Sequence, residues 1–195
     1  MVDRWIGNLL EKVDDLGLAD STMVMLVSDH GHALGEHGII GKVPRFLYPE
    51  LVDMPMLICH PEGYGASVRV DEWTYNLDLV STAYSALGVE APMRLDGIDL
   101  MALTEGAMSG RSWVTTAFND YVHYRDRERA MIVRNDGGDA RLFDLIEDPD
   151  WQHDVAEEKP NMVDELFARC LSDAGGDFPR YGDVRQSDTG AWYGV

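Results

Sequence analysis

The first residues of the chain alternate between apolar and polar types with the period of a helix. The apolar residues recur every three or four positions: Val2, Trp5, Ile6, Leu9, Val13 and Leu16. This spacing predicts an amphipathic helix with one apolar stripe. Gly17 follows the stripe directly, as is typical where a helix ends. We expect the apolar stripe of this helix to pack on a sheet.

A continuous apolar run replaces the helical period over residues 23–27. A short run without polar alternation is typical of a strand buried on both faces, as in a parallel sheet. The run stops at S-D-H-G-H, residues 28–32, so ligand-capable side chains directly follow a buried strand. Because open α/β sheets bind ligands at the carboxyl ends of their strands, we expect chemistry at this junction.

Residues 32–50 are rich in glycine and proline, which predicts an ordered loop. We expect its apolar residues to anchor it: Leu34, Ile39, Ile40, Phe46 and Leu47. A second short strand is predicted over residues 54–59. Residues 71–87 are predicted to form a helix that ends at Gly88, and residues 92–110 a loop. The apolar face of that helix consists of Leu77, Val80, Ala83, Tyr84 and Leu87.

The last part of the chain changes character. Three short strands are predicted, over residues 113–118, 130–134 and 141–145, and a D-G-G turn between the last two predicts a hairpin. A helix is predicted near Pro160, and glycines end it. Its apolar stripe consists of Val163, Leu166, Phe167, Cys170 and Leu171. Residues 177–195 are polar and are expected to form an extended tail.

Together these elements predict an α/β fold class. A mixed or parallel sheet flanked by helices is expected over residues 1–108, and a small antiparallel sheet with one helix follows over residues 109–195. We expect the first of these regions to carry the functional loop, because it contains the strand that ends in polar residues.

Composition and charge exclude several kinds of protein. The formal net charge of −19 excludes a nucleic-acid-coating protein, which needs a basic face. With 45% hydrophobic residues and 5 Trp, the chain is not a disordered acidic tail. No apolar run approaches the roughly 18–20 residues that cross a bilayer, so no membrane partner is expected. The first ten residues lack the features of a signal peptide. Two cysteines are too few for a disulfide scaffold, and Cys170 is expected to be a buried thiol.

The segment of residues 28–38 concentrates ligand-capable side chains, with three of the six histidines and two carboxylates. Asp29 and His30 offer an oxygen and a nitrogen ligand to a divalent cation. The structural alternative is that Asp29 caps a turn and His30 is hydrogen-bonded in the core. Lys42 is either a solvated surface charge or a residue that faces an anion. An amidohydrolase-type zinc site at His30 and His32 is disfavoured, because such enzymes need a barrel of ~250 residues.

Several ordered motifs resemble the sulfatase family of the alkaline-phosphatase superfamily. They are S-D-H-G-H-A-L-G-E-H-G (28–38), G-K (41–42), V-D-M-P-M-L-I (52–58), N-L-D-L-V-S-T (76–82), D-G-I-D-L (96–100) and L-F-D-L-x-E-D-P (142–149). The similarity extends to about residue 172. It implies that the α/β region belongs to an alkaline-phosphatase-like sheet and that the protein is a hydrolase of sulfate esters.

The resemblance also implies roles for individual residues. Asp29 and His30 would be metal ligands, for calcium in most members, with Mn²⁺ or Zn²⁺ as alternatives. Lys42 would be a catalytic and substrate-binding residue that contacts a sulfate oxygen and offsets charge in the transition state. His37 would either line the site or fix the loop. The partner would be a small-molecule sulfate ester.

The chain also departs from the family pattern. The nucleophile motif C-x-P-x-R, whose cysteine becomes formylglycine, is absent from the sequence. Cys59-His60-Pro61 imitates its start, but glycine stands where arginine is required, so Cys59 is interpreted as a core or strand-end thiol. We therefore expect the C-terminal half of a sulfatase, inactive alone and prone to self-association through the surface of the missing half. A phosphonate or phosphate ester hydrolase and a non-catalytic folded module remain alternatives. Substrate and compartment stay open.

Overall fold

A computed structural model describes residues 1–178, and the chain divides into two compact units. Unit 1 consists of Met1–Asp29 and Pro55–Gly110. Unit 2 consists of His30–Met54 and the chain from Arg111 onward. The predicted functional loop therefore belongs with the C-terminal sheet, although it precedes that sheet by more than fifty residues. The predicted tail over residues 177–195 lies almost wholly outside the described residues.

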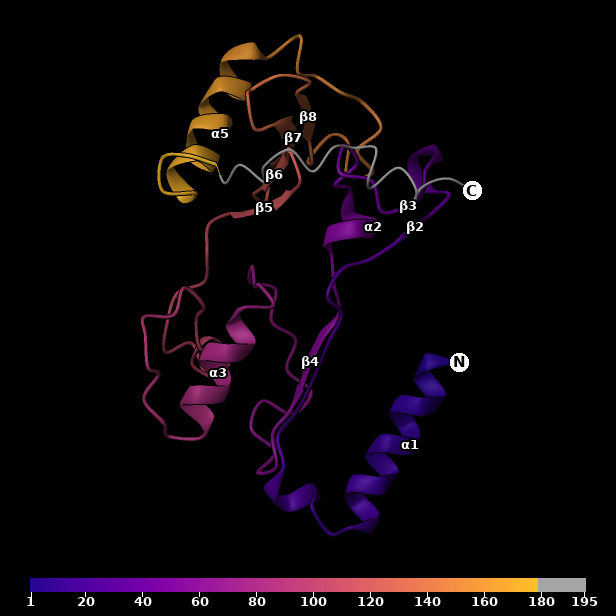
Figure 1. Ribbon diagram of the computed structural model, residues 1–195, viewed down its shortest axis with the longest axis vertical. Helices are drawn as coiled ribbons and strands as arrows, with labels where there is room; N and C mark the ends of the chain where they lie inside the picture. The colour runs from indigo at the N-terminus through magenta and orange to yellow at the C-terminus, as the bar shows by residue number, and fades with distance from the viewer. Residues whose placement is uncertain (179–195) are drawn as a thin grey trace. The chain divides into compact units, whose positions relative to one another are not determined.

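Unit 1 contains one two-stranded sheet and several helices (Figure 1). Its elements are α1 (Val2–Asp15), the 3-10 turn Ala19–Ser21, β1 (Val24–Val27), β4 (Met56–Cys59), α3 (Asp78–Ala86) and α4 (Leu100–Thr104). No helix within residues 1–178 is both long and apolar enough to cross a lipid bilayer.

The first helix is confirmed, but its predicted packing is wrong. α1 is capped at Leu16, and Gly17 has a φ of +67°, as expected for the residue after a helix end. None of its residues is buried, and Trp5 is 66% exposed. The spacing identified a face that can be buried, but no described element covers that face.

The strands predicted over residues 23–27 and 54–59 are confirmed as β1 and β4, whereas the predicted burial of the first strand on both faces is wrong. β1 pairs with β4 in antiparallel register, with Val24 opposite Cys59 and Val27 opposite Met56. Its residues are half-buried or exposed rather than buried on both faces. A continuous apolar run indicates that both faces of a strand can be buried. Among the described residues, however, β1 has only β4 beside it, so its faces stay partly exposed.

The helix predicted over residues 71–87 begins later, at Asp78, and its buried face is polar. Asp78 and Thr82 are fully buried, while Leu77, Val80 and Leu87 are exposed. The reason is hydrogen bonding: Asp78 accepts from the backbone N–H of Tyr75 at 2.7 Å and of Ile98 at 2.9 Å. Apolar spacing could not reveal a face held by a buried carboxylate.

The predicted loop over residues 92–110 contains the short helix α4. The Asp99 side chain caps it by accepting from the Met101 N–H at 2.9 Å, and Leu100 and Leu103 are buried. The hydroxyl of Thr82 accepts from the Leu100 N–H at 2.9 Å. Two of the family-like motifs, over residues 76–82 and 96–100, are thus one hydrogen-bonded structural module.

Unit 2 is built on a four-stranded antiparallel sheet in the order β5-β6-β7-β8. Its elements are β2 (Ala33–Leu34), the 3-10 turn Glu36–Gly38, β3 (Ile40–Gly41), α2 (Pro49–Val52), β5 (Val114–Phe118), β6 (Tyr121–Arg125), β7 (Arg129–Arg134), β8 (Arg141–Asp144) and α5 (Pro160–Asp173). The three predicted strands, the hairpin between β7 and β8 and the last helix are confirmed. Strand β6 is an addition.

Alternation along the central strands divides the interior of unit 2 into two clusters. On β7, Met131 and Val133 join the cluster beneath α5, together with Leu166 and Cys170. The other cluster lies on the opposite face of the sheet and consists of Leu47, Leu51, Ala130, Ile132, Phe143 and Trp151. Segment 30–54 therefore covers one face of the sheet through Leu47 and Leu51. Of the five expected loop anchors only Leu47 is buried, and Ile40 is 78% exposed.

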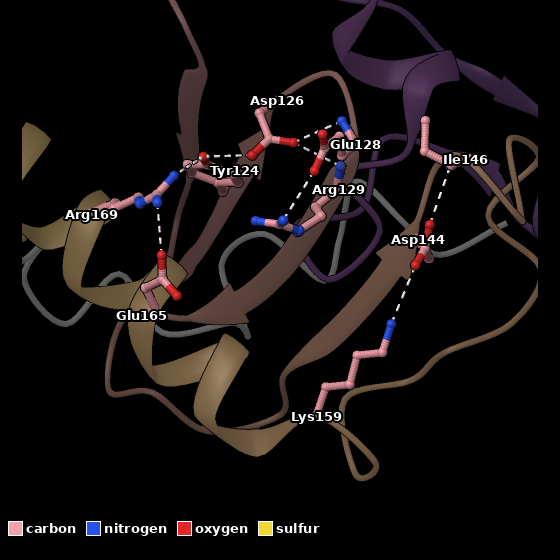
Figure 2. Close-up of polar contacts among 9 residues, drawn as sticks. All are labelled: Tyr124, Asp126, Glu128, Arg129, Asp144, Ile146, Lys159, Glu165 and Arg169. Atoms are coloured by element: carbon pink, nitrogen blue, oxygen red, sulfur yellow. Dashed lines mark hydrogen bonds and ion pairs between the residues drawn. The ribbon is translucent and has the colours of Figure 1, made fainter.

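Polar contacts fasten α5 to the sheet (Figure 2). Arg169 on α5 donates to the Tyr124 hydroxyl at 2.9 Å and to Glu165 at 2.7 Å. The Tyr124 hydroxyl donates to Asp126, whose other oxygen accepts from the Glu128 and Arg129 N–H groups of the β6–β7 turn. Burial raises the pKa of Tyr124 to about 12. Burial also raises the pKa of the Cys170 thiol to about 12, which fits the predicted buried thiol.

Candidate functional site

The structure brings two predicted site residues, His30 and Lys42, into direct contact. The Lys42 Nζ lies 3.0 Å from the His30 Nε2. The His30 Nδ1 lies 2.8 Å from the Gly31 carbonyl oxygen, and since a carbonyl only accepts, Nδ1 carries the ring proton. The Nε2 lone pair therefore faces the ammonium group. His30 is exposed, so the alternative of a core histidine is wrong.

Lys42 is held beside an aromatic ring as well as beside His30. Its Nζ lies 5.5 Å from the centroid of the Phe118 ring, at the end of β5. The residue is half-buried, and it follows the short strand β3. A lysine with two such neighbours is not a freely solvated surface charge, which favours the anion-facing interpretation.

Gly31 is required because α2 approaches its backbone closely. A Cβ at this position would lie 1.9 Å from the Glu50 carbonyl oxygen. The Gly31 N–H donates to the Leu51 carbonyl at 3.0 Å. Gly31, the residue that follows His30, is thus hydrogen-bonded to the backbone of α2.

Asp29 is exposed at the end of the segment that follows β1, and its backbone carbonyl accepts from the Asn76 amide at 3.3 Å. The boundary between the two compact units falls between Asp29 and His30. Within residues 1–178, no three His, Cys, Asp or Glu side chains form a group that could hold a metal ion. Asp29 and His30 thus belong to no such group among these residues.

The donor chemistry of these two residues nevertheless fits a divalent cation. The carboxylate supplies a hard oxygen and the imidazole a nitrogen ligand. Histidines that bind metals usually donate their other ring N–H to a carbonyl or carboxylate, which fixes the tautomer. The contact between His30 Nδ1 and the Gly31 oxygen has this form and leaves Nε2 as the donor atom.

His37 lies in a separate set of contacts from the His30–Lys42 pair. Its Nε2 donates to the Asp150 carbonyl at 3.1 Å, and its Nδ1 faces the Glu50 carboxylate at 3.4 Å. Its ring stacks on Tyr48 at 3.9 Å. His37 also lines a cavity of about 470 Å³ together with Glu36, Pro49, Glu50, Pro149, Asp150, Trp151 and Gln152. It fastens the 36–38 turn to the segment around Asp150.

Ion pairs and hydrogen bonds that no sequence pattern predicts hold segment 42–54 on the sheet. Arg125 on β6 donates to both carboxylate oxygens of Asp53, at 2.6 and 2.8 Å. Arg45 forms an ion pair with Asp139 at 2.9 Å, and Arg141 donates to the Tyr48 hydroxyl at 3.2 Å. These partners are more than seventy residues apart in the chain, so no local pattern could have found them.

Unit 1 has a cavity of its own, of about 580 Å³. It is lined by β4, by the loop over residues 60–70, by Thr74 and by α4. Cys59 is exposed at the end of β4, which agrees with its interpretation as a strand-end thiol.

Two family models match the chain. Residues 35–171 match the family described as N-sulphoglucosamine sulphohydrolase, C-terminal. Residues 1–45 match the family described as type I phosphodiesterase / nucleotide pyrophosphatase. The first match covers more than half of the chain and includes Lys42, His37 and the whole C-terminal sheet.

Curated relatives are longer proteins of the same kind. The chain is 29% identical over 175 residues to N-acetylglucosamine-6-O-sulfatase of Bacteroides thetaiotaomicron, covering 87% of this chain and 30% of that protein. It is 25% identical over 186 residues to human (Homo sapiens) arylsulfatase K, covering 87% and 34%. The chain thus spans about a third of the length of these relatives.

Solved structures share the fold. A structure described as BT4656 in complex with its substrate D-glucosamine-2-N,6-O-disulfate has a TM-score of 0.69 at 23% identity, covering 90% of this chain and 38% of that one. Phosphonate monoester hydrolase of Agrobacterium radiobacter has a TM-score of 0.76 at 23% identity, covering 88% and 38%. Fold and motifs together confirm the resemblance: the chain is similar to the C-terminal region of sulfatases of the alkaline-phosphatase superfamily and belongs to the N-sulphoglucosamine sulphohydrolase C-terminal family.

Proposed function

We propose that the protein acts in the hydrolysis of sulfate esters and that this chain contributes the His30–Lys42 side of the active site. The observation that carries the proposal is the 3.0 Å contact between Lys42 Nζ and His30 Nε2, in a segment with the family's motifs. An ammonium group beside a potential metal ligand is suited to an anionic ester, because both groups offset negative charge on the transferred sulfate.

The sulfatase family generally depends on a divalent cation. We assign Asp29 and His30 to part of its ligand set, with Ca²⁺ as the first choice and Mn²⁺ or Zn²⁺ as alternatives. The cation would act as a Lewis acid on the sulfate oxygens. When His30 gives its Nε2 lone pair to a ligand, Lys42 keeps all three N–H groups for the substrate anion. We assign Lys42 to a sulfate oxygen and His37 to holding the loop.

The proposed substrate class is a small sulfated sugar. The name of the Bacteroides relative specifies a 6-O-sulfate of N-acetylglucosamine, and one structural neighbour holds a disulfated glucosamine. A phosphonate or phosphate ester is the second candidate, favoured by the fold match to phosphonate monoester hydrolase. The motif C-x-P-x-R does not occur in the 195 residues, so the nucleophile in this proposal comes from outside this sequence.

Binding and turnover test the proposal separately. Calcium and glucosamine 6-sulfate are titrated into the labelled chain while backbone NMR signals are recorded. We expect calcium to shift the signals of residues 28–32, Asp29→Asn and His30→Gln to abolish that shift, and Lys42→Met to weaken ester binding. Lys12→Met is the matched control, because Lys12 is an exposed lysine on α1. Ester binding that is insensitive to Lys42→Met contradicts the proposal.

Turnover of an aryl sulfate and the matching aryl phosphonate by a longer protein that also contains the nucleophile motif distinguishes the two substrate classes. The chain alone is expected to hydrolyse neither, because it lacks the nucleophile motif. Efficient turnover by the chain alone would overturn the assignment of the nucleophile to another part of the protein.

A further inference from the structure

The contact between Arg125 and Asp53 joins a largely buried guanidinium group to a carboxylate that is 51% exposed. The Arg125 Nη1 lies 2.6 and 2.8 Å from the two Asp53 oxygens. The guanidinium carbon also lies 5.3 Å from the Trp151 ring centroid, and the Arg125 side chain is only 20% exposed. Because packing already orders the arginine, little conformational freedom is lost when it binds the carboxylate.

Asp53 stands at the C-terminal end of α2, where its N–H donates to the Pro49 carbonyl at 2.8 Å. Two residues earlier, the Leu51 carbonyl accepts from Gly31, and the Glu50 carbonyl lies against the Gly31 α-carbon. The buried Leu51 side chain fixes the same turn to the sheet. The position of α2 therefore decides the position of the Gly31 backbone.

Gly31 in turn sets the orientation of the His30 ring. Its carbonyl oxygen accepts from His30 Nδ1, which directs Nε2 at Lys42. A continuous series of contacts thus runs from β6 through Arg125, Asp53, α2 and Gly31 to the His30 ring.

We propose that Arg125 and Asp53 are positioning residues for the His30–Lys42 pair. They act through α2 and Gly31 and touch neither substrate nor cation themselves. This inference rests on the proposed function for its consequence in catalysis, but the support itself is a property of the fold of unit 2.

Other contacts hold the first part of the same segment. Arg45 pairs with Asp139, Arg141 donates to Tyr48, and Lys42 lies over Phe118. Loss of the Arg125–Asp53 contact should therefore leave residues 42–48 in place, while α2 keeps only the packing of Leu51 and holds Gly31 less firmly. The orientation of the His30 ring toward Lys42 would then change, while Lys42 keeps its position.

Amide hydrogen exchange of Gly31 tests the support without any activity. We expect Asp53→Asn and Arg125→Gln to accelerate exchange of the Gly31 N–H at least about tenfold, because its acceptor on α2 is freed to move. The amides of Ile132 and Leu142 in the sheet should keep their protection. Arg125→Lys should rescue Gly31 only partly, because an ammonium group lacks the planar guanidinium that lies over the Trp151 ring.

Arg134→Gln is the matched control. It removes an ion pair with Asp136 at 2.7 Å in the β7–β8 hairpin of the same unit. Unchanged Gly31 exchange in both test variants overturns the proposal. Equal acceleration at Gly31, Ile132 and Leu142 also overturns it, because the contact would then stabilise the whole unit rather than position one turn.

Binding of glucosamine 6-sulfate separates this inference from the proposed function. If Gly31 responds as expected while wild-type chain and Lys42→Met bind the ester equally, the proposed function fails and the support stands. If ester binding depends on Lys42 but Asp53→Asn changes neither Gly31 exchange nor affinity, the support fails and the proposed function stands.

Discussion

His123 on β6 is a buried titratable side chain without a polar partner. It is 2% exposed, it stacks on Trp151 at 5.8 Å, and neither ring nitrogen has a hydrogen-bond partner among the described residues. Burial, and secondly the charge of Arg125, lower its pKa from 6.5 to about 3. The folded protein therefore keeps this ring neutral under conditions in which an unfolded chain protonates it.

This difference predicts a pH-dependent stability of unit 2. Below pH 6.5 the His123 ring is protonated in the unfolded state, whereas in the folded state it stays neutral down to about pH 3. The free energy of unfolding therefore falls as the pH is lowered through this range. Between pH ~7 and pH ~4.5 the loss should be of order 2–3 kcal/mol. Urea unfolding of wild-type chain and His123→Phe at both pH values measures it.

On acidification, the free energy of unfolding of His123→Phe should fall less than that of wild-type chain. The difference between the two should be of order 2–3 kcal/mol. His153→Phe is the control, because His153 is an exposed histidine in the same unit. Equal acid sensitivity of wild-type chain and His123→Phe would show that His123 is not the group responsible.

Gly31 provides a second prediction at the scale of one residue. In Gly31→Ala the added Cβ would meet the Glu50 carbonyl at 1.9 Å, so α2 or the D-H-G turn must move. We expect calcium-induced NMR shifts of residues 28–32 to be lost and unit 2 to be destabilised by about 1–3 kcal/mol. In the control Gly7→Ala, nothing lies within 4 Å of the new atom and α1 should be slightly stabilised. A Gly31→Ala variant as stable as wild-type chain would contradict the close approach.

At the scale of elements, buried polar groups join α3 to α4. Asp78 accepts two backbone hydrogen bonds, and Thr82 accepts one from α4 while donating to the Asp78 carbonyl at 2.8 Å. Gly97 makes room for this junction, because a Cβ there would lie 2.6 Å from the Leu77 carbonyl oxygen. The motif residues in this region therefore have a structural role.

Removing one acceptor at this junction should be costly. Asp78→Ala leaves the N–H groups of Tyr75 and Ile98 without their acceptor, and Thr82→Val removes the acceptor of Leu100. We expect each change to lower the free energy of unfolding of unit 1 by about 2–4 kcal/mol. Thermal unfolding followed by circular dichroism measures the loss. The exposed Asp20→Ala is the control, and a comparable loss in that variant would refute a specific role of the junction.

Individual elements also show what the sequence could and could not predict. α1, α5 and the β7–β8 hairpin follow from local spacing and turn residues, because those signals lie within one element. β6 could have been found from Asn119-Asp120, a two-residue turn between the paired Phe118 and Tyr121, in which Asn119 has a φ of +53°. The buried face of α3 could not, because its cause is a hydrogen bond to Ile98, twenty residues away.

The candidate site likewise has residues that the sequence motifs identify and contacts that they do not. The motif resemblance identified His30 and Lys42 as residues to consider, and the structure brings them within 3.0 Å of each other. The contacts that orient them come from Leu51 and Arg125, which belong to no motif, and from Asp53, which lies in the 52–58 motif but whose partner Arg125 is seventy-two residues away. A sequence pattern records which side chains are present, whereas the support of a site depends on contacts between distant segments.

At the scale of the whole molecule, apolar surface is concentrated in unit 1. Trp5 and Leu9 on α1 and Leu57 on β4 are exposed, and both strands of its sheet have an unpaired edge among the described residues. We therefore expect the chain to self-associate despite its net charge of −19, as measured by light scattering at increasing concentration. Added salt should strengthen the association, because it screens the repulsion between acidic chains.

Trp5→Glu combined with Leu9→Glu should shift the chain toward monomer. Ile146→Glu is the control for an added acidic charge, because Ile146 is exposed on unit 2. A monodisperse monomer in wild-type chain, or an equal effect of the control, would contradict the assignment of the contact to α1.

The two cysteines give each unit its own chemical reporter. Cys59 in unit 1 is exposed, whereas Cys170 in unit 2 is buried under α5 with its thiol pKa raised to about 12. A thiol-specific reagent should modify Cys59 at once and reach Cys170 only when α5 detaches from the sheet. The labelling rate of Cys170 would then measure how often α5 detaches from the sheet, without any amino-acid substitution. A ligand that stabilises the packing of α5 on the sheet should slow this labelling.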